Sequence, residues 1–232
     1  MWALWTLFIS TTKALIMKWY QFPLQSQASE EGIVALGGDL SVDRLVSAYA
    51  QGIFPWPHEG YPLLWFCPWE RGILFFDRLH IGRSLNKAIK KNPWRITIDQ
   101  DFSGVILECS KIQRPNQNGT WISEEMIVSY SELHRRGYAH SVEVWENDQL
   151  IGGVYGVFVK NVFSAESMFY KKSNASKIAI YFLVQYLKSK GLVWMDVQML
   201  TDITEYLGGE LKTQKEYLTL LKESQQKLSI KW

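Results

Sequence analysis

The chain has 232 residues, which corresponds to one or two domains, because a domain usually holds about 100–200 residues. Hydrophobic residues make up 47% of the sequence and charged residues 21%, a globular composition that excludes a disordered protein. The net charge of +2 argues against a nucleic-acid-binding surface over the whole chain. The sequence contains 11 Trp, 11 Tyr and 11 Phe, more than a core of this size needs, which suggests that some aromatic surface serves binding.

Residues 1–16 are rich in apolar side chains. The run 2–9 is too short to span a bilayer, which takes about 20 apolar residues, and it lacks the basic start and cleavage site of a signal peptide. We expect Met17 to be the true start, so that residues 1–16 are a non-structural extension. A membrane-associating tail is the alternative.

Residues 17–120 predict a small, irregular α/β domain at the N-terminal side. Ser41 starts a short helix, which Gly52 ends. The segment 52–76 contains four of the seven prolines, a density that disfavours a helix or a central strand. We therefore expect a rigid, irregular loop that displays three tryptophans, namely Trp56, Trp65 and Trp69.

The same domain is expected to contain a basic helix at 82–91. Its apolar side holds Leu85 and Ile89, and another face gathers four basic side chains: Arg83, Lys87, Lys90 and Lys91. The segment 71–95 holds seven basic residues and one acidic residue, so it carries +6 and the remainder of the chain −4. The small total charge therefore conceals a polarised molecule. A helix face that is merely solvated is the alternative.

Residues 121–232 predict an α+β domain. The expected elements are a helix after Ser123, strands at 140–145, 150–158 and 162–169, an amphipathic helix from 173 or 174 to 191, and a strand at 192–198. This order, a β-hairpin followed by β, α and β, is typical of acyltransferase-like domains in which helices pack on a mixed sheet.

Three polar residues stand out on the expected strands of this domain. Asp196 and Gln198 are two positions apart, so both side chains point to the same face. Glu166 lies on another apolar strand beside aromatic residues. Two acids and an amide in such surroundings predict either a pocket that attracts a cation or a buried polar network that fixes strand register.

Several kinds of site are missing from the sequence. It has no P-loop, no dinucleotide-binding glycine motif, no CxxC pair and no nucleophile elbow. The four histidines share no metal-ligand spacing, so we expect no zinc or iron site. The two cysteines, Cys67 and Cys109, lie in apolar surroundings, which predicts reduced thiols in a reducing compartment.

Ten short sequence blocks occur in a characteristic order and spacing between about residue 20 and residue 221. They are GGDLS (37–41), GIFPW (52–56), LWFCP (64–68), LHIGRSL (79–85), GTWI (119–122), GYAHSVEVW (137–145), GGVYGV (152–157), ESMF (166–169), ASK (175–177) and DVQ (196–198). Together they resemble the bacterial leucyl/phenylalanyl-tRNA–protein transferases.

The resemblance implies a cytoplasmic enzyme that moves Leu or Phe from aminoacyl-tRNA to the α-amine of proteins beginning with Arg or Lys. The product is marked for N-degron proteolysis. The family fold implies a small N-terminal domain, here 17–120, and a larger GNAT-like domain, here 121–232. Aminolysis of an activated ester requires no cofactor or metal, and we expect a monomer whose partners are aminoacyl-tRNA and the acceptor protein, with no stable membrane partner.

The resemblance also assigns residues to roles. Asp196, Gln198 and Glu166 match the catalytic site, in which Asp196 orients Gln198 near the amine. Trp121 matches an aromatic residue near the 3′ adenosine of the tRNA. The pocket for the Leu or Phe side chain matches Trp56, Val154, Phe163, Leu183 and Leu187. The basic face of 82–91 is expected to contact tRNA phosphates.

The sequence departs from the family at 201–209, where a Thr-Pro-His-Leu-like run is replaced and no histidine remains. Because this segment adjoins the expected site, it bears on acceptor choice and on the preference for Leu or Phe. Two other functions fit the same scaffold: a peptidoglycan-type aminoacyl-tRNA transferase, which is normally a longer chain with a duplicated domain, and a non-catalytic module that binds RNA or a degron.

Overall fold

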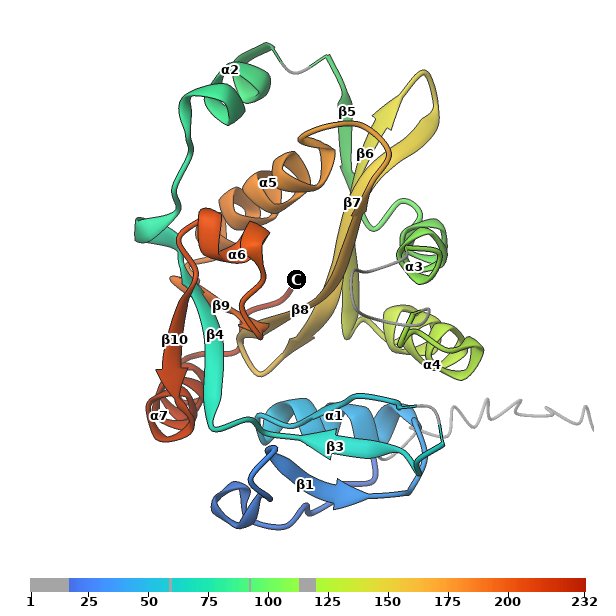
Figure 1. The fold of residues 1–232 in the computed structure, drawn as a ribbon, viewed down its shortest axis with the longest axis vertical. Coiled ribbons are helices and arrows are strands. Elements are labelled where there is room, and N and C mark those ends of the chain that lie inside the picture. The colour runs from blue at the N-terminus through green and yellow to red at the C-terminus, as the bar shows by residue number, and fades with distance from the viewer. Residues whose placement is uncertain (1–16, 59, 92, 113–119) are drawn as a thin grey trace, which may run out of the picture.

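A computed structural model of the chain describes residues 17–58, 60–91, 93–112 and 120–232. The expectation for residues 1–16 lies outside these ranges. The described residues form two sheets (Figure 1): a small one of order β1-β3-β2 and a seven-stranded one of order β10-β4-β9-β8-β7-β6-β5. Among these residues, no helix has both the length and the apolar character needed to cross a membrane.

The small sheet contains β1 (Ile33–Leu36), β2 (Phe54–Pro55) and β3 (Leu64–Phe66), and the helix α1 (Val42–Ala50) packs beside it. The prediction of an irregular loop at 52–76 is therefore wrong in part, since β3 is the central strand of the small sheet. The sheet tolerates the prolines because Pro55 lies on the two-residue edge strand and the others lie between strands. Trp65 is fully buried instead of displayed, and its indole N–H donates to the Gly37 carbonyl at 2.9 Å.

The large sheet is mixed, which confirms the expected α+β class. Its strands are β4 (Glu70–Phe75), β5 (Arg95–Ile98), β6 (Ala139–Glu146), β7 (Gln149–Val159), β8 (Val162–Tyr170), β9 (Trp194–Gln198) and β10 (Glu210–Thr213). All neighbours are antiparallel except β8 and β9, which run parallel and place Ser164 opposite Asp196. The crossover between these two strands is the helix α5 (Ala175–Ser189).

Helices cover both faces of the large sheet (Figure 1). The helices α3 (Phe102–Ser110) and α4 (Glu124–Arg135) lie on one face, and α5 with α6 (Asp202–Tyr206) lies on the other. The expected basic helix is confirmed as α2 (Arg83–Lys91), which contacts α5. The last helix, α7 (Gln214–Gln225), packs beside β10 and β4. The described residues also form two short 3₁₀ helices, η1 (Gln25–Gln27) and η2 (Phe76–Arg78).

The expected domain boundary at residue 120 does not separate the two sheets. β4 pairs with β9 and β10, and β5 pairs with β6, so both strands belong to the large sheet. The physical reason is visible in β4, where Ile73 and Leu74 have no exposed surface and need cover on both faces. The sheets divide between β3 and β4, at residues 67–69.

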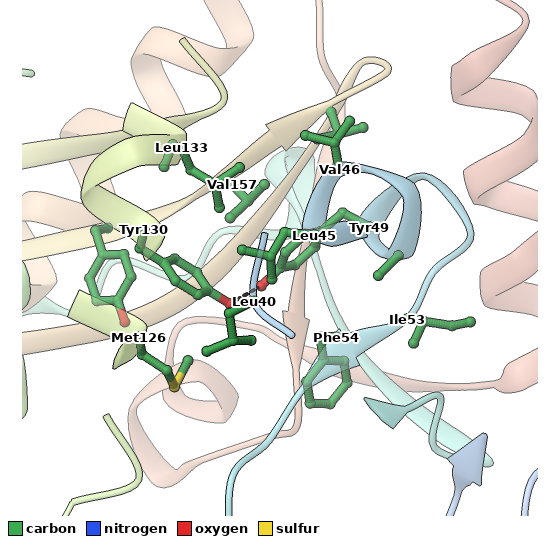
Figure 2. Packing of buried hydrophobic residues seen from close by; sticks show 14 of the residues in the cluster. Leu40, Leu45, Val46, Tyr49, Ile53, Phe54, Met126, Tyr130, Leu133 and Val157 are labelled. Atoms are coloured by element: carbon green, nitrogen blue, oxygen red, sulfur yellow. Dashed lines mark hydrogen bonds between the residues drawn. The ribbon is translucent and has the colours of Figure 1, made fainter. Parts of the chain in front are cut away.

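The small sheet and the large sheet share one core. Figure 2 shows this cluster, in which Leu45 and Tyr49 of α1 lie against Met126, Tyr130 and Leu133 of α4. The hydroxyl groups of Tyr49 and Tyr130 point toward one another in this view, 2.5 Å apart. As a result, α1 reaches from the small sheet to the polar centre of the large one.

Candidate active site

A cavity of about 590 Å³ lies where residues of both sheets, α5 and α6 meet. Its lining is mostly apolar. Among the described residues that line it, the charged ones are Glu166 and Asp202. A concave, apolar cavity with a few convergent polar groups is the usual form of a small-molecule or substrate site.

The cavity contains five of the residues that were expected at the site: Trp56, Trp121, Val154, Glu166 and Gln198. Phe163, Leu183 and Leu187 do not line it and belong instead to the core between α5 and the sheet. The leucines have no exposed surface because that face of α5 lies against the strands. Phe163 stacks on Trp232, with ring centroids 5.4 Å apart.

Gln198 and Glu166 form the polar end of the cavity. The Gln198 Nε2 donates to Glu166 Oε1 at 2.7 Å, and the Tyr49 hydroxyl donates to the same oxygen at 2.7 Å. The Tyr130 hydroxyl lies 3.5 Å from Glu166 Oε2. A carboxyl group from β8, an amide from β9 and a phenol from α1 are thus held together in one network.

Burial raises the pKa of Glu166 to about 8, and the nearby Asp196 carboxylate adds to this. The Tyr49 hydrogen bond, the Arg71 charge and the Gln198 amide act in the opposite direction but do not cancel the rise. The pKa values of Tyr49 and Tyr130 are raised well above their usual range, first by burial and next by the Glu166 charge, so both phenols remain proton donors. Glu166 is therefore a carboxyl group that can hold or release a proton near neutral pH.

Asp196 does not reach the cavity. It has no exposed surface and pairs with the guanidinium of Arg71, whose Nε and Nη2 donate to its two oxygens at 2.8 and 2.6 Å. Ser164 donates to Asp196 Oδ2 at 3.0 Å. The prediction that Asp196 and Gln198 share a face agrees with this arrangement, since Asp196 contacts Ser164 and Gln198 contacts Glu166 along the same side of β8.

The four basic residues expected to contact tRNA lie on α2 with exposed side chains. None of them forms an ion pair with another residue in the described part of the chain. The helix and the small sheet lie at opposite ends of the view in Figure 1. The basic face is therefore free to bind an extended anionic partner, but its residues do not line the cavity.

A group of possible metal ligands escaped the sequence analysis. Asp99, His134 and His140 place ligand atoms within 4.8 Å of one another. However, the two ring nitrogens of His140 face Asp99 Oδ2 at 2.8 Å and the Gly137 carbonyl at 3.2 Å, and His134 Nδ1 faces the Ala139 carbonyl at 2.8 Å. Each of these three nitrogens already faces an oxygen of the protein at hydrogen-bond distance, so the geometry favours a structural cluster over a metal site.

Two sequence models of one family match the chain: "Leucyl/phenylalanyl-tRNA protein transferase N-terminal domain" at residues 38–68 and "Leucyl/phenylalanyl-tRNA protein transferase" at residues 73–222. The chain belongs to the leucyl/phenylalanyl-tRNA–protein transferase family. The boundary between the two matched ranges, 38–68 and 73–222, lies close to the point where the chain passes from β3 of the small sheet to β4 of the large sheet.

Relatives in this transferase family match most of the chain. The leucyl/phenylalanyl-tRNA–protein transferase of Flavobacterium johnsoniae is 47% identical over 201 residues, covering 87% of this chain and 95% of the relative. That of Pseudoalteromonas atlantica is 46% identical over 202 residues, covering 87% and 86%.

Similar solved structures are more distant. L-PGS from Bacillus licheniformis gives a TM-score of 0.43 at 11% identity, covering 68% of this chain and 65% of that one. A GCN5-related N-acetyltransferase-like protein from Streptococcus suis gives 0.36 at 15% identity, covering 62% and 60%. The chain spans less than two thirds of either structure.

Four residues of the site were missed by sequence reasoning: Tyr49, Arg71, Tyr130 and Asp202. Tyr49 and Tyr130 occur at core positions of amphipathic helices, where a tyrosine usually indicates packing. Arg71 did offer a signal, because an arginine at the start of the apolar run GILFF requires a partner once it is buried.

Proposed function

We propose that this chain transfers Leu or Phe from aminoacyl-tRNA to the N-terminal α-amine of acceptor proteins that begin with Arg or Lys. The observation that carries the proposal is the Gln198–Glu166 pair at the polar end of a deep apolar cavity. The product is an N-degron signal for proteolysis in the cytoplasm. The enzyme acts as a monomer that consists of the larger transferase domain and the small N-terminal domain.

The reaction forms one amide bond and breaks one ester bond. The α-amine nitrogen attacks the ester carbonyl carbon, and the 3′ oxygen of the tRNA ribose leaves with a proton from that nitrogen. Before attack, the α-ammonium group must lose a proton, and its ordinary pKa is about 7.7–8.0. Glu166 has a pKa of about 8, so a proton can pass from the ammonium group to the ionised carboxylate at little cost.

Gln198 serves as a positioning group for the amine, since an amide is a poor base. Its Nε2 donates to Glu166, so its Oε1 is left to accept a hydrogen bond from the incoming amine. Holding the amine and the ester in one geometry accounts for a large share of the rate enhancement in reactions of this type.

The donor occupies the apolar part of the cavity. Trp56 and Val154 contribute surface to the pocket for the Leu or Phe side chain, together with Met168 and Met195. Trp121 offers a ring on which the 3′ adenosine can stack. The basic face of α2 provides phosphate contacts to the body of the tRNA.

Asp202 supplies the negative charge for an acceptor side chain. It is exposed, lines the cavity, and receives no hydrogen bond or ion pair from any described residue. It lies in the segment where this sequence departs from the family, and Thr201, Ile203 and Thr204 of the same segment line the cavity too. A carboxylate at this position favours the guanidinium or ammonium group of an N-terminal Arg or Lys.

The test uses labelled Leu-tRNA and Phe-tRNA with two peptides that differ only in an N-terminal Arg or Ala. Label transfer to the Arg peptide alone is expected. Binding of the tRNA without transfer would indicate a non-catalytic module, and transfer to a cell-wall precursor with none to the Arg peptide would indicate a peptidoglycan-type enzyme. Either result would overturn the proposal.

A further inference from the structure

Arg71 is a buried arginine whose ion-pair partner is Asp196. Its side chain is 1% exposed. Besides Asp196 on β9, the guanidinium donates to the Gly52 carbonyl at 3.2 Å and to the Tyr217 hydroxyl of α7 at 3.3 Å. It also lies over the rings of Phe54 and Tyr217. Arg71 therefore joins β2, β4, β9 and α7 at one point.

Gly52 is required at this junction. It has a φ of +75°, and a Cβ added there would lie 2.8 Å from a ring carbon of Tyr217. The chain can bring its carbonyl to Arg71 only without a side chain. The turn that ends α1 thus places the Gly52 carbonyl where the Arg71 guanidinium can donate to it.

The Asp196 carboxylate has no free acceptor site for a substrate. Its Oδ1 accepts from Arg71 Nε and from the backbone N–H of Gln198, both at 2.8 Å. Its Oδ2 accepts from Arg71 Nη2, Ser164 and Tyr217. Asp196 consequently acts on Gln198 through the main chain and not through the Gln198 side chain.

The backbone of Gln198 has an unusual conformation that this contact supports. Its φ is +61°, in the left-handed region that residues with a Cβ rarely adopt. A carboxylate that accepts the N–H two residues ahead closes an Asx-turn, which stabilises such a bend. Because the bend directs the side chain, it sets where Nε2 meets Glu166.

We propose that Arg71 is a positioning residue for aminoacyl transfer, which fixes Asp196 so that Asp196 holds Gln198 in its left-handed conformation. This inference rests on the proposed function for its kinetic consequence, while its structural consequence can be measured independently. Arg71 itself touches no substrate, because it does not line the cavity.

The test compares Arg71→Lys and Arg71→Met with Arg78→Met, a control that removes an exposed arginine from the same segment. Transfer of Leu to an Arg peptide is measured first with the unaltered chain. For Arg71→Met we expect kcat to fall about 100-fold, as for a misplaced reacting group, with the KM for aminoacyl-tRNA within about threefold of the unaltered value. Arg71→Lys keeps the charge but not the two-pronged contact with Asp196, so it should recover about tenfold of the loss and leave kcat about tenfold below the unaltered value. Arg78→Met should leave both constants unchanged.

A second variant and a second readout cover the cases in which Arg71→Met does not fold or the unaltered chain shows no transfer. Ser164→Ala removes one donor to Asp196 without altering Arg71, and it should lower kcat about tenfold. Amide hydrogen exchange at Gln198 should be slow in the unaltered chain and faster in Arg71→Lys, whether or not transfer is observed. A wild-type kcat in Arg71→Lys and Ser164→Ala, or unchanged exchange at Gln198, would overturn the role of Arg71 without bearing on the reaction itself.

Discussion

Two carboxyl groups occupy neighbouring positions between β8 and β9, yet they have opposite surroundings. Asp196 has a guanidinium partner and no exposed surface, whereas Glu166 is surrounded by hydroxyl and amide donors and opens onto the cavity. A cation beside a buried carboxylate offsets its desolvation, but neutral donors offset less of it. Asp196 is therefore held in place and accepts the Gln198 backbone N–H, whereas the raised pKa of Glu166 suits the proton exchange that we propose for it.

The largest effect is expected at the Asp196 end. Asp196→Asn removes the charge opposite Arg71 and leaves a buried guanidinium without its ion-pair partner, so we expect the free energy of unfolding to fall by about 3–5 kcal/mol. Urea denaturation measures this loss. The matched control is Asp43→Asn, which breaks the part-exposed pair with Arg136 and should cost less than about 1 kcal/mol. An equal loss of unfolding free energy in both variants would contradict the expectation that the buried pair contributes more than the part-exposed pair.

At the Glu166 end the expected effect is on catalysis. Glu166→Gln keeps the shape and the hydrogen-bond acceptor for Gln198 but cannot take a proton, so kcat should fall about 100-fold. Single-turnover transfer of Leu to an Arg peptide measures it. A kcat within about threefold of the unaltered enzyme would mean that another group, such as water, takes the proton.

The same substitution also changes how stability depends on pH. The pKa of Glu166 is raised from 4.5 to about 8 on folding, so between these pH values the folded chain holds a proton that the unfolded chain has lost. This contribution is complete below about pH 4.5 and disappears as pH rises through 8, at up to about 1.4 kcal/mol per pH unit. Thermal unfolding of Glu166→Gln should lack this fall. Parallel Tm curves from pH 5 to 8 would contradict the raised pKa.

Much of the fold could be predicted from sequence because its signals are local. Ser123 caps α4 by accepting from the Met126 N–H, and Asn147 and Asp148 form the tight turn of the β6–β7 hairpin with φ of 48° and 59°. The central network could not be predicted in this way. Arg71 and Asp196 are 125 residues apart, and Tyr49 and Glu166 are 117 apart. Periodicity showed that Leu183 and Leu187 face inward, but not that the cavity lies elsewhere.

A smaller effect is expected at the basic face of α2, whose residues do not line the cavity. Lys87→Glu with Lys90→Glu reverses two charges on the basic face of α2, so the KM for aminoacyl-tRNA should rise about tenfold. The slope of log KM against log salt should flatten by about two, one for each lost phosphate contact. Lys215→Glu with Lys222→Glu on α7 is the control with equal charge. If the slope of log KM against log salt were the same in both double variants, α2 would not be part of the tRNA interface.

The smallest effect is expected at the mouth of the cavity. Asp202→Asn removes a solvent-exposed carboxylate, and an exposed ion pair contributes about 0.2–1 kcal/mol, so the KM for a peptide beginning with Arg should rise about fivefold at most while kcat stays the same. Glu205→Gln is the matched control, since Glu205 is an exposed acid of the same helix that does not line the cavity. Asp202→Lys should go further and disfavour an N-terminal Arg relative to an uncharged side chain of similar length, because like charges then meet. A similar response of Asp202→Asn and Glu205→Gln would show that the acceptor senses the overall charge of α6 and does not contact Asp202 itself.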